Sequence, residues 1–122
     1  MKHQLKSFKD AFKGIFSAFK AESHMRFHLV AAVFVLLFAY ISEMNLSQWA
    51  ILLITIGCVF SAELINTAIE NLCDLYSTEH NPLIGKIKDI AAGAVLILAI
   101  FAAGVALCLF IFTGRLYFAF LK

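Results

Sequence analysis

Residues 47–74 read SQWAILLITIGCVFSAELINTAIENLCD, and the change of character within this stretch decides the fold. From Trp49 to Ala62 the residues are almost all apolar, which predicts a membrane-spanning helix that starts at an interfacial tryptophan. Polar residues then recur at helical spacing without a helix breaker: Glu63, Asn66, Glu70 and Asp74. At 100° per residue these side chains point within about 80° of one another, so one helix face changes from lipid-like to acidic.

The composition of the whole chain indicates a membrane protein. Of its 122 residues, 62% are apolar and 15% are charged, and the mean hydropathy is +0.90. Soluble chains are closer to about half apolar and a quarter charged. The length allows about three spans of 20 residues and one shorter segment, which leaves no room for a separate soluble catalytic domain. The net charge of +2 gives no reason to expect nucleic-acid binding, and the three cysteines show neither metal-ligand nor disulfide spacing.

We expect one all-α integral membrane domain over residues 1–122. The expected elements are a surface helix over about 4–22 and spans over about 24–42, 47–76 with a cytoplasmic extension, and 86–113. Within the first segment, apolar side chains fill an arc of about 100° and lysines flank it; the apolar residues are Leu5, Phe8, Phe12, Ile15, Phe16 and Phe19. This pattern predicts a helix lying in the membrane interface, the alternative being a helix packed on protein. Whether the tail over 114–122 continues the last helix is left open.

Basic residues predict the orientation in the membrane. The N-terminal segment is rich in lysine, and the second loop is followed by Lys86 and Lys88, whereas the first loop has no lysine or arginine. The positive-inside rule then places the N-terminus and the second loop in the cytoplasm and the C-terminus outside. Arg115 and Lys122 weigh slightly against this assignment.

A carboxylate at membrane depth is costly, and it indicates function by default. Glu63 lies about 21 Å along the helix from Trp49, inside the cytoplasmic boundary of the bilayer. The topology brings Glu22, Lys88 and Asp89 to the same level. Carboxylates, an amide and a lysine together suit a divalent cation and phosphate. For Asp74 and Lys86, a hydrated helix end without a function explains the sequence as well as a functional role does. We interpret His24 and His28 as residues at the membrane interface.

Soluble phosphate-transfer signatures are absent from the sequence. It contains no GxxxxGK[ST] loop, no GxGxxG after a strand and no HExxH. No serine lies in a nucleophile elbow either.

Three blocks resemble the prokaryotic diacylglycerol kinase family of small membrane lipid kinases. The first is ELINTAIE from Glu63 to Glu70, with Asp74 following, and the second is KDIAAGAV from Lys88. The third, Glu22 to Leu29, is similar to the start of the family's first span and is closest to Gram-positive members, which are similar to undecaprenol kinases.

The resemblance implies a homotrimer with composite active sites at the cytoplasmic interface. It implies phosphoryl transfer from Mg-ATP to a lipid hydroxyl, with Glu63 as general base and Asn66 beside the reacting groups. Glu22 and Glu70 correspond to carboxylates that bind Mg²⁺ and border the nucleotide. The remaining nucleotide contacts implied by the resemblance are Glu79, His80, Asn81, Lys88 and Asp89.

Two positions depart from the family pattern. Position 3 is His where arginine is common, and position 10 is Asp where an aromatic residue is frequent. Contacts from the surface helix to ATP therefore stay open. The resemblance favours undecaprenol as the substrate over diacylglycerol. The alternatives outside the family are a small channel lined by carboxylates and a non-catalytic membrane scaffold.

Overall fold

The computed structural model describes the backbone of residues 1–120, with the side chains of all of these except Lys2 and 115–120. Four helices and no strand occur in this range: α1 (Lys2–Ala21), α2 (Ser23–Ile41), α3 (Leu46–Tyr76) and α4 (Pro82–Phe120). The prediction of an all-α fold is confirmed. Arg115 and Lys122, which entered the orientation argument, have side chains outside the described part.

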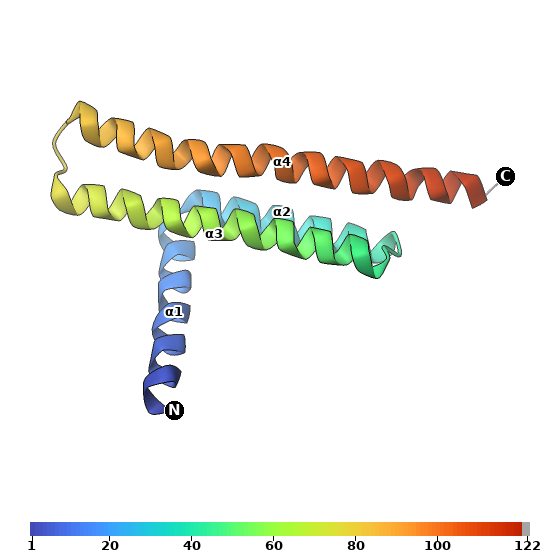
Figure 1. Ribbon diagram of the computed structural model, residues 1–122, viewed down its shortest axis with the longest axis horizontal. Helices are drawn as coiled ribbons and strands as arrows, with labels where there is room; N and C mark the ends of the chain where they lie inside the picture. The colour runs from blue at the N-terminus through green and yellow to red at the C-terminus, as the bar shows by residue number, and fades with distance from the viewer. Residues whose placement is uncertain (121–122) are drawn as a thin grey trace.

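Three of the four helices are long and apolar enough to cross a membrane. The shortest, α2, has 19 residues, which corresponds to about 28 Å of helix and matches a hydrocarbon core of about 30 Å. α2, α3 and α4 run alongside one another, whereas α1 projects to one side near the beginning of α2 (Figure 1). The prediction of a surface helix followed by three membrane helices is confirmed.

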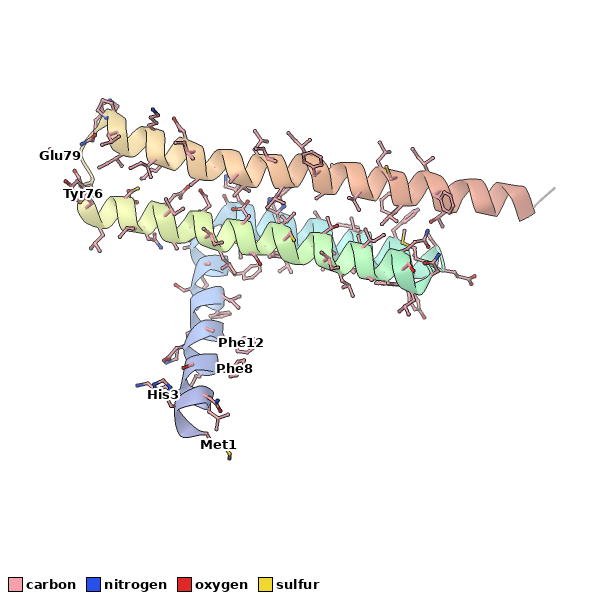
Figure 2. All side chains as sticks on the ribbon, viewed as in Figure 1. Met1, His3, Phe8, Phe12, Tyr76 and Glu79 are labelled. Atoms are coloured by element: carbon pink, nitrogen blue, oxygen red, sulfur yellow. The ribbon has the colours of Figure 1, made fainter. Side chains whose placement is uncertain are left out.

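The helix α1 is amphipathic in the sense that a membrane surface requires. Phe8 and Phe12 are each 68% exposed. They project from α1 on the side toward which the three long helices extend, and His3 projects on the other side (Figure 2). Phenylalanines on that side would enter the apolar layer that α2, α3 and α4 cross, with the polar face of α1 toward water.

A sharp break separates α1 from α2 at Glu22, whose backbone is extended with φ −103° and ψ 123°. Arg26 fixes this corner, because its Nη1 donates to the carbonyl oxygens of Phe19 at 3.0 Å and Lys20 at 2.9 Å. These are carbonyls of the last turn of α1, which have no partner within the helix. Phe19 also packs against Phe60 of α3, with ring centroids 5.7 Å apart.

The helices α2 and α3 pack antiparallel in a regular register. Buried residues on α2 recur every seven positions at Met25, Ala32 and Ala39. On α3, Leu52 joins the same core cluster as Ala39, and Val59 lines the same groove as Ala32. Each step of seven residues along α2 is thus matched by a step of seven residues in the opposite direction of the chain along α3. This is the spacing of two helical turns, which keeps one face of each helix on the other.

Side-chain caps set the ends of the helices. At the start of α3, Asn45 Oδ1 accepts from the Gln48 amide at 3.0 Å and Gln48 Oε1 accepts from the Asn45 amide at 2.9 Å, a capping box. Asn81 Oδ1 accepts from the Leu83 amide at 2.9 Å. This cap lets α4 begin at Pro82, earlier than the expected start at residue 86, because proline suits the first helical turn. The backbone helix also continues past residue 113.

The outer faces of the long helices carry large apolar side chains. Phe34 is 68% exposed on α2 and Phe101 is 70% exposed on α4. Apolar surfaces of this kind are stable in contact with lipid or with further protein, but not in contact with water.

Candidate functional site

The carboxylate of Glu63 is buried and lies within ion-pair distance of a histidine on the neighbouring helix. Glu63 is 5% exposed. Its Oε1 lies 3.0 Å from His28 Nε2, and the His28 side chain is 19% exposed. At this distance an imidazole N–H at Nε2 can donate to the carboxylate oxygen. The pair lies in the same antiparallel register as the apolar contacts between α2 and α3, so packing of the spans holds it in place.

Asn66 and Glu70 form the second contact of the site, one turn further along α3. Asn66 Nδ2 donates to Glu70 Oε1 at 3.1 Å. The other polar atom of the amide, Asn66 Oδ1, is buried and accepts no hydrogen bond from any described residue. A buried acceptor without a donor costs about 1–3 kcal/mol. This oxygen is therefore available to accept a hydrogen bond from a ligand, or to bind a ligand's metal ion.

Lys88 and Asp74 connect α4 to the end of α3. Lys88 Nζ donates to Asp74 Oδ1 across the two helices. The Asp74 side chain is 55% exposed, so the pair stands at the hydrated end of the bundle. Asp74 thus contacts Lys88, and this contact fits a hydrated helix end as well as a functional site.

The turn between α3 and α4 carries three further predicted residues: Glu79, His80 and Asn81, all exposed. It lies at the far end of α3, beyond the point where α1 leaves the bundle (Figures 1 and 2). The Asn81 side chain caps α4, so the structure gives it a structural task of its own. Asp89 is exposed on the first turns of α4.

The donors suit Mg²⁺, although no described group of three or more His, Cys, Asp or Glu side chains is arranged to hold a metal ion. Mg²⁺ commonly takes one or two carboxylates, with water and substrate phosphates completing its shell. Glu22 at the break between α1 and α2, and Glu70 and the unpartnered Asn66 oxygen on α3, are oxygen donors of the right kind.

An apolar groove of about 280 Å³ begins beside the His28–Glu63 pair. Its lining comes from α2, α3 and α4 and includes Phe27, His28, Val59, Phe60, Ala99 and Ala103. Alanines on α4 leave this space open because their side chains are short. The apolar lining suits a hydrocarbon chain, and His28 is the lining residue that contacts the Glu63 carboxylate.

His28 is the site residue that sequence reasoning missed. Its interpretation as an interfacial residue like His24 is wrong, because its Nε2 lies 3.0 Å from the carboxylate of the buried Glu63. Helical spacing places position 28 on the same face of α2 as Met25, but only the structure shows that this face is packed.

Known proteins resemble this chain over most of its length. The profile of the prokaryotic diacylglycerol kinase family matches residues 9–110. An undecaprenol kinase of Bacillus subtilis is 40% identical over 106 residues, or 87% of this chain and 86% of that protein. A diacylglycerol kinase of Synechocystis is 38% identical over 86% of this chain and 61% of that protein. One of Escherichia coli is 28% identical over 84% of each.

These similarities confirm the resemblance of the three sequence blocks, and with it the prediction of a kinase in place of a channel or a scaffold. The apolar helices agree with a multi-pass membrane protein. The chain therefore belongs to the prokaryotic diacylglycerol kinase family of membrane lipid kinases.

Proposed function

We propose that this protein transfers the γ-phosphate of ATP to the hydroxyl of undecaprenol at the cytoplasmic membrane interface, giving undecaprenyl phosphate and ADP. The observation that carries the proposal is the buried Glu63 carboxylate, which contacts His28, a residue that lines an apolar groove. The choice of undecaprenol is supported by the 40% identity to the Bacillus subtilis undecaprenol kinase. The alcohol would approach from the lipid and ATP from water.

In the proposed reaction Glu63 acts as general base. Its carboxylate accepts the proton of the lipid hydroxyl as the oxygen forms a bond to the γ-phosphorus, and the bond from that phosphorus to the β-phosphate oxygen breaks. ADP leaves with the electron pair of the broken bond. Asn66, next along the same face of α3, would use its unpartnered oxygen at the reacting groups or their metal.

Nucleotide binding is assigned to the polar residues at the cytoplasmic end of the bundle. Glu22 and Glu70 would hold Mg²⁺, which when bound neutralises phosphate charge and orients the phosphates. Lys88 would exchange its contact with Asp74 for a phosphate oxygen as ATP enters. Asp89 and the turn with Glu79, His80 and Asn81 would border the rest of the nucleotide.

We further propose a homotrimer with its N-termini in the cytoplasm and each site completed by a neighbouring subunit. The large apolar side chains exposed on α2 and α4 support association with further chains.

Diacylglycerol is the second candidate substrate. It is supported by the 38% identity to the Synechocystis diacylglycerol kinase, which is nearly as high as that to the undecaprenol kinase. Both lipids present a hydroxyl on an apolar body, so Glu63 and the groove serve either.

The test is phosphorylation with radiolabelled ATP by purified protein in mixed micelles. Undecaprenol and diacylglycerol are offered separately, each with Mg²⁺ and with chelator. We expect Mg²⁺-dependent label chiefly on undecaprenol. Label chiefly on diacylglycerol would replace the substrate and keep the site, whereas label on neither lipid by folded protein would overturn the proposed function.

A further inference from the structure

We infer that His28 is a positioning residue, which orients the Glu63 carboxylate toward the lipid hydroxyl by donating a hydrogen bond from Nε2 to Oε1. The inference rests on the proposed role of Glu63 as base. Its geometric basis is the 3.0 Å contact between α2 and α3, with Glu63 5% exposed.

A glutamate side chain has three rotatable bonds, so burial alone does not fix which carboxylate oxygen meets a substrate. The bond from His28 occupies Oε1. This leaves Oε2 as the oxygen that takes the proton from the alcohol, and it sets the plane of the carboxylate. A base that is held in one orientation does not have to be ordered at each turnover.

The position of His28 also connects the base to the substrate groove. The same imidazole that contacts Glu63 lines the groove. Its ring meets the neighbouring Phe27 ring edge-on, with centroids 5.6 Å apart, and Phe27 lines the groove too. An alcohol whose chain lies in this groove would therefore bring its hydroxyl to the Glu63 oxygen that His28 leaves free.

Substitutions at His28 distinguish positioning of the Glu63 carboxylate from a role in packing alone. His28→Leu keeps an apolar side chain of moderate size and removes the donor. His28→Gln can place an amide N–H close to the position of Nε2, so it retains a donor to Glu63. His24→Leu is the matched control, since His24 lies one turn earlier on α2 and is exposed.

The measurements are kcat and KM for each substrate, with folding checked by size-exclusion chromatography and thermal unfolding. We expect His28→Leu to lower kcat by about 10- to 100-fold, as misplacement of a catalytic group does, with little change in KM for ATP. His28→Gln should recover most of the lost kcat, and His24→Leu should behave as wild type. A His28→Leu enzyme with wild-type kcat, or a His28→Gln enzyme no better than His28→Leu, would overturn the inference.

A double-mutant cycle with Glu63→Gln tests whether His28 acts through Glu63. When the base is already absent, His28→Leu should cost almost nothing more, because the two residues act as a unit. An equal further loss in the Glu63→Gln background would show that His28 acts by another route and would refute the positioning role.

Nitrogen-15 NMR spectra of protein with labelled histidines test the contact between His28 and Glu63 independently of catalytic activity. The His28 ring signals, assigned by their loss in His28→Gln, should shift in Glu63→Gln and stay in place in Glu43→Gln. If the signals shift in Glu63→Gln but the wild-type protein phosphorylates neither lipid, the proposed function is wrong and the contact between His28 and Glu63 is confirmed. If the wild-type protein is an active kinase but the signals do not shift in Glu63→Gln, the inference about His28 is wrong and the proposed function is retained.

Discussion

Asn66 donates its amide N–H to the Glu70 carboxylate at 3.1 Å, and its own oxygen stays buried without a donor among the described residues. The bond orients both side chains along one face of α3. The carboxylate that is proposed to hold Mg²⁺ is thereby fixed beside an acceptor that incoming groups can satisfy.

Glu70→Gln tests this arrangement. We expect the variant to require about tenfold or more Mg²⁺ for half-maximal rate, the usual scale for losing a ligand or its orienting partner. A Mg²⁺ titration of lipid phosphorylation measures the effect. Glu43→Gln is the control, because Glu43 lies in the turn at the opposite end of the bundle. An unchanged Mg²⁺ requirement in Glu70→Gln would remove Glu70 from the metal site.

Glu63→Gln should separate catalysis from nucleotide binding. The amide keeps the shape of the side chain and cannot take a proton, so we expect kcat to fall by about 10²- to 10⁴-fold. Binding of Mg-ATP, followed with a fluorescent ATP analogue, should be retained. An equally large loss of ATP binding would show that Glu63 holds the metal or the fold, and does not act as the base.

Lys88 and Asp74 should differ in what they contribute. Lys88→Met removes the cation proposed to contact phosphate, so KM for ATP should rise and kcat should fall. Asp74→Asn removes only the charged partner of Lys88 in the free protein. We therefore expect Asp74→Asn to be the milder variant in steady-state kinetics with varied ATP. The reverse order would mean that Asp74 itself contacts the nucleotide or its metal.

Most of the fold was predictable because hydropathy and helical period are local signals. The surface helix and three apolar helices follow from residue spacing alone, since lipid leaves a spanning chain few alternatives to the helix. The start of α4 at Pro82 was missed because it depends on one side-chain cap from Asn81, which spacing does not reveal.

Within the candidate site, the contact that lies on a single helix was predictable from residue spacing. Glu63, Asn66 and Glu70 share a face of α3, and the Asn66–Glu70 contact follows from that spacing. The contact between His28 and Glu63 joins two helices. Its formation depends on the register between α2 and α3, which the sequence does not state.

Arg26→Gln tests what holds α1 at its corner with α2. The guanidinium donates to two carbonyls that end α1, and losing such charged bonds at an exposed position should cost about 1 kcal/mol. We expect a drop in Tm of a few degrees in micelles, measured by circular dichroism. Lys20→Gln, which leaves the backbone carbonyl in place, should change Tm less. An equal drop in both variants would attribute the effect to surface charge and not to the cap.

Filling the apolar groove should weaken lipid binding without affecting ATP. Ala103 lines the groove, and Ala103→Phe places a ring where the hydrocarbon chain is proposed to lie. Ala94, nine residues earlier, points about 180° away on α4 at 100° per residue, and it is exposed. We expect Ala103→Phe to raise KM for undecaprenol several-fold with KM for ATP unchanged, and Ala94→Phe to leave both near wild type. If both variants raise KM for undecaprenol alike, the loss comes from helix packing, and the alcohol binds elsewhere.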